Sequence, residues 1–580
     1  MRASSLRIRL IAVCVVLLTV GYIGQLFILQ VVNGEAYGKE ADARFVALDS
    51  TEFDRGTIYF RERTGDLVSA ATLKERFIIA INPSELVNIE DAYVALNSVA
   101  STSREQFMVA ALKKDDPYEI VGGTGSREIS QKINELKVRG LATYRTYDRY
   151  YPAGSLAAHV LGFLAKTKDS GDELIGRYGL EQEYNDTLAR SGEQLFVNAF
   201  ASVFANISAS VAGDVTEEDY DIVTTIEPTV QAYVESELAD ILDTYSAKVA
   251  GAIVINPKTG EIYAMAGAPT FNPNSYGNVE SASVYLNPFV QHVYEMGSVF
   301  KPLTIAAGID AGVITPETTY NDVGVLSIDG YKVSNYDGRG RGVVSMQEVL
   351  SQSLNTGTVF VAEELGAERF REYFNRYRLS NITGIELPGE EAGLTENLSS
   401  PRAIERATAS FGQGIAFSPI VFTQALTAFA NDGAMVRPRI IKALRKKDGT
   451  LIEKEPIVVG LPISPETADT VTQMLVEVVD DALLGGTVSF DDYSIAAKTG
   501  TAQISNPAGG YYDDRYLHTF FGYFPAYKPE FLVFLFVNEP QGELYASHTL
   551  TYPFMRIAEF LLNYYEVPPD RATQTKSPVI

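Results

Sequence analysis

The chain has 580 residues, of which 46% are hydrophobic and 21% charged, and this length is too great for one hydrophobic core, so we expect two or more folded domains. The formal net charge of −25 at pH 7 argues against a nucleic-acid partner, because phosphate binding needs a basic face. A single cysteine excludes an intrachain disulfide, and four scattered histidines show no metal-ligand spacing, so no structural zinc site is predicted.

An apolar run without charges occupies residues 10–29 and is long enough to cross a bilayer as a helix. Three arginines lie within residues 1–9, and the positive-inside rule then predicts a cytoplasmic N-terminus. We therefore expect one uncleaved transmembrane anchor at residues 10–32, with the rest of the chain outside the cytoplasmic membrane. A cleaved signal peptide is the alternative, but the run is long for one and no good small-residue cleavage site follows.

Residues 33–220 mix short strand-like runs with charged helical stretches and contain no strong catalytic constellation. The pattern changes at Asp221, where a strand-like run is followed by a helix that starts with Pro228 in its first turn. We place a domain boundary there, between a domain at 33–220 and a second at 221–565. The last residues, 566–580, are polar and proline-bearing and are predicted to form a disordered tail.

The second domain has strand-like segments at both ends and a largely helical middle. Residues 250–255 and 262–266 flank a turn of five turn-forming residues, 256–260, and predict a β-hairpin. Three further strand-like runs lie near the other end, at 495–504, 520–524 and 531–537. A sheet built from both ends of a domain around a helical middle predicts an α+β fold.

The first chemical motif is Ser298-Val299-Phe300-Lys301. On a helix, residues three apart share a face, so the hydroxyl of Ser298 and the amine of Lys301 can meet. Pro302 fits a helix only near its start, which predicts a helix beginning at about Gly297 or Ser298. The serine would then lie at the positive end of the helix dipole, and a lysine kept neutral by burial could take its proton.

The second motif is Ser353-Leu354-Asn355. Residues 345–348 predict a capping box that opens a short helix, and residues 357–365 predict another helix, so the motif falls at a junction between helices. There Ser353 could relay a proton and the amide of Asn355 could hold a substrate carbonyl. The two side chains could equally satisfy helix ends.

The third motif is Lys498-Thr499-Gly500-Thr501, within the strand-like run at 495–504. A glycine inside a strand often marks the close approach of another backbone or a ligand. The lysine and the threonine hydroxyls would suit a substrate carboxylate. Alternatively, the lysine could protect an edge strand from aggregation.

Each motif by itself is weak, but together and in this order they resemble the S-x-x-K, S-x-N and K-T-G elements of the penicillin-binding and β-lactamase superfamily. The resemblance covers nearly the whole chain and is to class B penicillin-binding proteins, the monofunctional transpeptidases. Further similar segments are Arg55–Ile58 with Arg63–Gly65, Tyr151–Gly154 with Ala158–Gly162 and Gly179–Glu181, and Ser410–Gly414 with Ser418–Pro419. One departure is Glu295-Met296-Gly297, where the family more often has E-P-G.

The resemblance implies an α+β transpeptidase domain, with helices on both sides of an antiparallel sheet and a helical subdomain, behind an elongated α+β pedestal domain and one anchor helix. It also implies the roles of the site residues. These are Ser298 as nucleophile, Lys301 as base, Ser353 and Asn355 beside it, Lys498, Thr499, Gly500 and Thr501 at the substrate carboxylate, and the backbone NH groups of Ser298 and Thr501 as oxyanion hole. No metal or organic cofactor is implied.

The implied reaction is the cross-linking of peptidoglycan stem peptides through a serine acyl-enzyme, with β-lactams as covalent inhibitors. The alternatives are a D,D-carboxypeptidase or β-lactamase, in which water is the acceptor, and a non-catalytic penicillin-binding sensor or scaffold. The similarity is closer to the septal division type than to the elongation type. A multi-pass glycosyltransferase and division proteins are then the expected partners, since no glycosyltransferase segment lies before Asp221.

Overall fold

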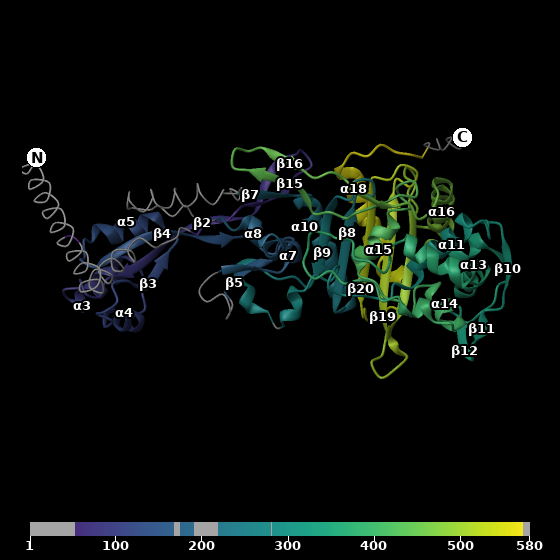
Figure 1. Cartoon of the computed structure of the whole chain (residues 1–580), viewed down its shortest axis with the longest axis horizontal. Coiled ribbons are helices and arrows are strands. Elements are labelled where there is room, and N and C mark those ends of the chain that lie inside the picture. The colour runs from purple at the N-terminus through teal and green to yellow at the C-terminus, as the bar shows by residue number, and fades with distance from the viewer. Residues whose placement is uncertain (1–21, 23–52, 167–173, 191–218, 280, 572–580) are drawn as a thin grey trace, which may run out of the picture. The chain divides into compact units, whose positions relative to one another are not determined.

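The computed structural model describes Tyr22 and residues 53–166, 174–190, 219–279 and 281–571 (Figure 1). The predicted anchor at 10–32 lies outside these residues, apart from Tyr22. Among the residues described, no helix combines the length and the apolar character needed to span a bilayer.

The chain divides into two compact units, and the last described segment of the larger one begins at residue 219, next to the predicted boundary at Asp221. Of the described residues, the smaller unit contains Tyr22, 53–55 and 73–149, and the larger contains 56–72, 150–166, 174–190 and those from 219 onwards. Early segments join the larger unit because β1 (Ile58–Arg61) pairs in parallel with β7 (Tyr220–Thr224), which places Ile58 opposite Ile222.

The smaller unit packs helices against the second half of β2 (Leu67–Ile81) and its partner strand β3 (Glu119–Thr124). Its helices are α3 (Ile89–Val99), α4 (Arg104–Ala111) and α5 (Arg127–Glu135), and β4 (Leu141–Tyr150) also pairs with β2. Each helix begins with a side-chain cap, from Asn88, Ser103 and Ser126 respectively. Helices and strands share one small core that includes Ile79, Leu96 and Phe107.

A five-stranded antiparallel sheet forms the centre of the larger unit, in the order β18-β19-β20-β8-β9 (Figure 1). Its strands are β8 (Val249–Ile255), β9 (Ile262–Ala268), β18 (Ala496–Ser505), β19 (Tyr511–Phe524) and β20 (Phe531–Asn538). The prediction of an α+β sheet built from both ends of the domain is confirmed. The second strand of the sheet, β19, begins nine residues earlier than the predicted run at 520–524.

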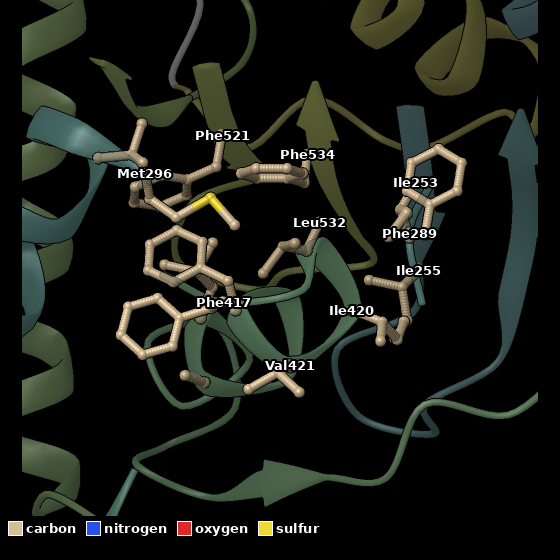
Figure 2. Packing of buried hydrophobic residues seen from close by; sticks show 14 of the residues in the cluster. Ile253, Ile255, Phe289, Met296, Phe417, Ile420, Val421, Phe521, Leu532 and Phe534 are labelled. Carbon is tan, nitrogen blue, oxygen red and sulfur yellow. The ribbon is translucent and has the colours of Figure 1, made fainter. Parts of the chain in front are cut away.

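Helices cover both faces of this sheet, because alternate strand residues point to opposite faces. Ala252 and Val254 of β8 face a core formed with α10 (Pro228–Tyr245) and α18 (Thr551–Tyr564). On the other face, Ile253 of β8 packs with strand residues and with residues before α11 (Lys301–Asp310) and around α15 (Pro419–Leu426) (Figure 2). The residues labelled there are Ile253, Ile255, Phe289, Met296, Phe417, Ile420, Val421, Phe521, Leu532 and Phe534.

The middle of the larger unit is mainly helical, as predicted. Its helices are α11 (Lys301–Asp310), α12 (Met346–Ser351), α13 (Asn355–Arg376), α14 (Ala403–Ala409), α15 (Pro419–Leu426) and α16 (Pro465–Glu477). The sequence did not predict two nested hairpins between α11 and α12, in which β10 (Thr319–Asp322) pairs with β13 (Gly342–Ser345) around the pair β11 (Val325–Ile328) and β12 (Tyr331–Ser334). We call residues 319–345 the double hairpin.

Shorter elements complete the larger unit. They are α6 (Ala158–Leu161), β5 (Phe163–Lys166), β6 (Leu174–Arg177), α7 (Gly179–Glu183), α8 (Asn185–Leu188), β14 (Met435–Val436), β15 (Ile441–Lys446), β16 (Leu451–Glu453), β17 (Val458–Gly460) and α17 (Ala546–Thr549).

The beginning of the predicted disordered tail is ordered. Val567 is buried, and the carboxylate of Asp570 accepts a 2.7 Å hydrogen bond from the backbone NH of Ser494. Arg571 forms a 2.6 Å ion pair with Asp480. The prediction of disorder is therefore wrong for residues 566–571, because these contacts attach them to the domain, and residues 572–580 lie outside the described chain.

Candidate active site

Ser298 lies in a short 3₁₀ turn, Gly297–Phe300, that continues directly into α11. Pro302 occupies the first turn of α11, as predicted, but the α-helix begins at Lys301, and the predicted start at Gly297 or Ser298 coincides with the start of the 3₁₀ turn. Gly297 has a φ of +64°, and its NH donates a 3.0 Å hydrogen bond to the carbonyl of Gly412. The turn therefore holds the half-buried Ser298 at the amino-terminal end of a buried helix.

The side chains of Lys301 and Lys498 meet at the hydroxyl of Ser353. The Nζ atom of each lysine donates a 3.1 Å hydrogen bond to Ser353 Oγ. Lys301 also donates to the carbonyl of Ser353, and Lys498 to the carbonyl of Thr499. The structure thus brings together one residue from each of the three predicted motifs, whereas the hydroxyl of Ser298 receives no hydrogen bond from the described part of the chain.

Burial changes the proton affinity of both lysines. Burial, followed by the positive charge of Lys498, holds the pKa of Lys301 well below 10.5. Burial lowers the pKa of Lys498 to about 8. Its lowered pKa lets Lys301 act as a neutral amine that accepts a proton, while Lys498 keeps most of its positive charge at neutral pH.

Ser353 lies at the predicted junction of helices, between α12 and α13, with a φ of +55°. Ser345 caps α12 by accepting a 3.2 Å hydrogen bond from the NH of Glu348, which is one half of the predicted capping box. The next helix, α13, begins at Asn355 rather than at the predicted residue 357. The side-chain NH₂ of Asn355 donates to the carbonyl of Ser334 at 2.8 Å.

Gly500 explains why a glycine interrupts β18. A Cβ atom at this position would lie 2.4 Å from Thr519 Oγ1 and 2.9 Å from both the carbonyl oxygen of Met296 and the NH of Val299. The missing side chain lets the edge strand β18 contact the turn that carries Ser298. One position further along, the hydroxyl oxygen of Thr501 accepts a 3.0 Å hydrogen bond from the NH of Ala546, which leaves its proton available to a ligand.

A cavity of about 1600 Å³ joins these groups. The predicted site residues in its wall are Ser298, Ser353, Asn355, Lys498, Thr499 and Thr501. Lys301 is fully buried behind the wall. Within the described ranges, no three His, Cys, Asp or Glu residues gather closely enough to hold a metal ion.

Comparison with known proteins identifies this arrangement. The profile of the penicillin-binding protein transpeptidase domain matches residues 250–557, which is more than half of the chain. The chain belongs to this family. The profile of the penicillin-binding protein dimerisation domain matches residues 50–214, ahead of the transpeptidase domain. This combination is that of a class B penicillin-binding protein, as the three motifs implied.

Named relatives extend over most of this penicillin-binding transpeptidase. It is 30% identical over 513 residues to stage V sporulation protein D of Bacillus subtilis. The alignment covers 87% of this chain and 77% of that protein. It is 26% identical over 584 residues to the peptidoglycan D,D-transpeptidase FtsI of Escherichia coli, covering 98% and 93%. Among solved structures, penicillin-binding protein 3 of Mycobacterium tuberculosis in complex with aztreonam aligns with a TM-score of 0.66 at 26% identity, covering 90% and 98%.

The transpeptidase cavity also contains an acidic group to which the sequence assigned no role. Glu295 lies three residues before Ser298, and its carboxylate accepts hydrogen bonds from the NH of Gly414 at 3.1 Å and the hydroxyl of Tyr511 at 3.0 Å. Burial raises the pKa of Glu295. In the sequence, Glu295-Met296-Gly297 stands out only as a departure from the family pattern, and the polar start of β19 carries no sign that Tyr511 reaches this wall.

Proposed function

We propose that this penicillin-binding transpeptidase acylates Ser298 with the penultimate D-alanine of a peptidoglycan stem peptide. The observation that carries the proposal is the meeting of Lys301 and Lys498 at Ser353 Oγ, in the cavity that Ser298 lines. The enzyme is a peptidoglycan D,D-transpeptidase and binds β-lactams, which are attacked by the same nucleophile.

In the acylation step, the hydroxyl oxygen of Ser298 attacks the carbonyl carbon of the D-Ala-D-Ala bond while neutral Lys301 takes its proton. The backbone NH groups of Ser298 and Thr501 stabilise the oxyanion, since β18 packs against the nucleophile turn. The proton then passes through Ser353 to the departing nitrogen, and D-alanine leaves. An amine of a second stem attacks the acyl-enzyme, forms the cross-link and frees Ser298.

The remaining site residues hold the donor stem. The charge of Lys498 and the hydroxyl groups of Thr499 and Thr501 attract its terminal carboxylate, on the side of the cavity formed by β18. Gly500 contributes by keeping this strand close to the nucleophile turn. Asn355 faces the cavity and offers its side-chain amide to the stem backbone.

We further propose a cellular location and a role for the enzyme. The apolar run at 10–32 anchors the chain in the cytoplasmic membrane with residues 1–9 inside, so a pedestal at 33–220 and the catalytic domain at 221–565 act outside. The similarity to FtsI supports a role in septal cell-wall synthesis. Without a glycosyltransferase segment between residue 33 and Asp221, strand polymerisation falls to a partner, which we propose to be a multi-pass glycosyltransferase acting with division proteins.

A fluorescent penicillin tests the nucleophile. The full chain in detergent becomes covalently labelled, and Ser298→Ala abolishes the label; labelling that persists in this variant would refute the assignment. Incubation with donor and acceptor stem peptides then shows whether the acyl-enzyme reacts with an amine or with water. Cross-linked product supports transpeptidation, whereas release of D-alanine without cross-linking would show a carboxypeptidase. If neither product forms, the remaining explanation is a non-catalytic sensor or scaffold.

A further inference from the structure

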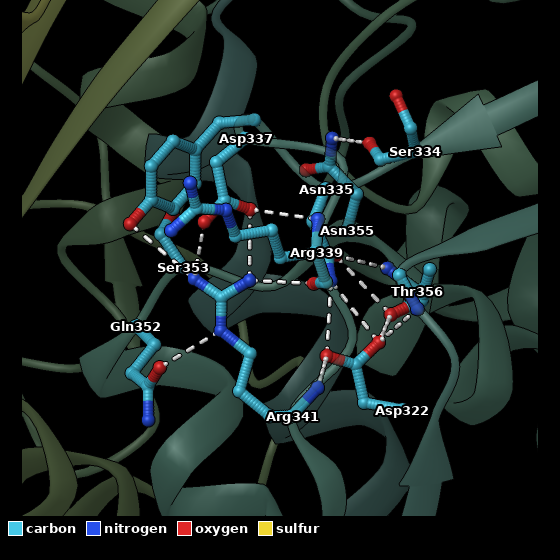
Figure 3. A network of polar contacts seen from close by, with 12 residues as sticks. Asp322, Ser334, Asn335, Asp337, Arg339, Arg341, Gln352, Ser353, Asn355 and Thr356 are labelled. Carbon is cyan, nitrogen blue, oxygen red and sulfur yellow. Dashed lines mark hydrogen bonds and ion pairs between the residues drawn. The ribbon is translucent and has the colours of Figure 1, made fainter.

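The double hairpin, residues 319–345, surrounds a buried carboxylate close to the second motif (Figure 3). Asp322, at the end of β10, is only 2% exposed. Four groups donate hydrogen bonds to it: Thr356 Oγ1 at 2.7 Å, the NH groups of Gly324 and Arg341 at 2.9 Å, and the side-chain NH₂ of Asn335 at 3.0 Å. A buried carboxylate satisfied in this way fixes the groups around it.

These bonds hold the first residues of α13. Asn335, itself 2% exposed, accepts a 3.2 Å hydrogen bond from the NH of Thr356 in addition to donating to Asp322. The neighbouring carbonyl of Ser334 accepts the 2.8 Å bond from the side chain of Asn355. Both residues that follow Leu354 are therefore attached to the double hairpin.

The residue before Ser353 is attached to the same element. Arg341, whose backbone NH donates to Asp322, uses its side-chain Nε to donate a 3.1 Å hydrogen bond to Gln352. Its guanidinium is held by a two-fold ion pair with Asp337, at 2.8 and 2.9 Å. The double hairpin thus contacts the chain on both sides of Ser353 (Figure 3).

Close backbone packing leaves little freedom around Asp322. A Cβ atom on Gly324, which has a φ of +79°, would lie 2.4 Å from the carbonyl carbon of Arg339. A Cβ atom on Gly340 would lie 2.6 Å from the carbonyl oxygen of Asp322. The two glycines allow the backbone to pack closely around the carboxylate. A shift of the carboxylate would therefore also shift the groups that are hydrogen-bonded to it.

Between the attached residues, Ser353 has the left-handed φ of +55°, a conformation that a serine keeps only where its surroundings impose it. Its hydroxyl is the atom at which the two lysines meet. We propose that Asp322 is a positioning residue of the transpeptidase, which acts through Asn335 and Thr356 to hold the hydroxyl of Ser353 in its catalytic position. This inference rests on the function proposed for Ser298, Lys301 and Ser353.

The test is a double-mutant cycle between Asp322 and Ser353. The rate constant of acylation by a fluorescent penicillin is measured for the full chain in detergent and for Asp322→Ala, Ser353→Ala and the double variant. We expect Asp322→Ala to slow acylation roughly 10- to 100-fold, which is the effect of misplacing a catalytic group by about 1 Å. The double variant should acylate within about threefold of Ser353→Ala alone, because a residue that acts through Ser353 has no effect once its hydroxyl is gone.

A matched control is Asp329→Ala, which removes another carboxylate of the double hairpin. Asp329 accepts its hydrogen bond from the NH of Ile404, and no hydrogen bond among the described residues joins it to residues 352–356, so acylation should stay within about threefold of wild type. If Asp322→Ala does not fold, as shown by loss of its cooperative melting transition, Asn335→Ala carries the same prediction because it breaks the link to Thr356.

Two results would overturn the inference. One is wild-type acylation by a folded Asp322→Ala or Asn335→Ala variant. The other is that Asp322→Ala lowers the acylation rate constant by the same factor in wild type and in Ser353→Ala. Such a result would indicate a general effect on the domain. Failure of the proposed function is distinguishable, because it would appear as retained label in Ser298→Ala or wild-type acylation by Ser353→Ala.

Discussion

Replacing Lys498 by methionine should remove activity and, at neutral pH, stabilise the protein. Lys498 is 3% exposed, and burial lowers the pKa of its amine from 10.5 to about 8. The folded domain therefore holds an ammonium ion in a place that disfavours it. Methionine has a similar volume and cannot be protonated, so the variant keeps the packing without the charge.

The magnitude follows from the pKa. A fall from 10.5 to about 8 corresponds to about 3 kcal/mol of unfolding free energy, at about 1.4 kcal/mol per pKa unit. Since the folded state has the lower pKa, the unfolded state binds more protons between pH 8 and 10.5, and wild-type stability should rise with pH across this interval. The variant also loses the hydrogen bonds to Ser353 and Thr499, at about 1 kcal/mol each. Lys498→Met should then be about 1 kcal/mol more stable than wild type at pH 7 and about 2 kcal/mol less stable near pH 10.5.

The assay is urea unfolding of both proteins in the same detergent, at a series of pH values from 7 upwards. The chain contains 33 tyrosines and no tryptophan, so tyrosine emission or circular dichroism reports unfolding. Lys258→Met is the matched control, because it removes one exposed amine from the turn between β8 and β9. In parallel, penicillin labelling of Lys498→Met should fall by at least tenfold, since the substrate carboxylate loses its cation.

The reasoning fails if the stability difference between Lys498→Met and wild type stays constant from pH 7 to above pH 9. It also fails if the same change appears in Lys258→Met, because the effect would then come from net charge rather than from a buried amine. A variant much less stable than wild type at pH 7 would show that hydrogen bonding outweighs the cost of the buried charge.

Three further predictions concern activity and order. The acylation rate constant should have a bell-shaped pH profile, which stopped-flow acylation across a pH series measures. It should rise with pH as Lys301 loses its proton and fall again near pH 8 as Lys498 loses its charge. Gly412→Ala should slow penicillin labelling at least tenfold, because φ is +80° and a Cβ atom would lie 2.4 Å from the carbonyl oxygen of Gly297, the residue before the nucleophile. The matched control is Gly312→Ala, where φ is +67° but a Cβ atom would meet no other atom within 4 Å. It should lower the free energy of unfolding by only about 1 kcal/mol and leave labelling unchanged. Deleting the chain from Asp570 should lower the unfolding free energy by roughly 1–3 kcal/mol, visible as a lower melting temperature, and an unchanged melting temperature would contradict the ordered tail.

Local sequence signals predicted the parts of the site that depend on neighbouring residues. Pro302 marked the start of the nucleophile helix, and the capping residues at 345–348 marked α12. Gly500 indicated a close backbone approach, and the structure shows which backbone it meets. In each case one residue type restricts the conformation of its own segment, so no knowledge of distant contacts is needed.

What the sequence could not predict depends on distant partners. The start of β19 at Tyr511 is rich in polar residues and lacks the alternating pattern of a half-buried strand, so only its later part was recognised. Asp322 looks like any surface aspartate until Asn335 and Thr356 are brought to it by the fold. The tail was judged from its composition, although Arg571 finds a partner in Asp480. Pairing across tens or hundreds of residues leaves no local signal.

The order of the central sheet also has a consequence for how the protein is made. In that sheet β8, near residue 250, pairs with β20, near residue 535, so the hydrogen-bonding groups on one side of β8 stay unpaired until almost the whole domain has been synthesised. Such distant pairing makes folding slow and leaves an apolar strand edge open to association with other chains in the meantime. Newly made enzyme should therefore depend on folding assistance that protects β8, and the appearance of penicillin-reactive protein should lag behind the completion of the chain.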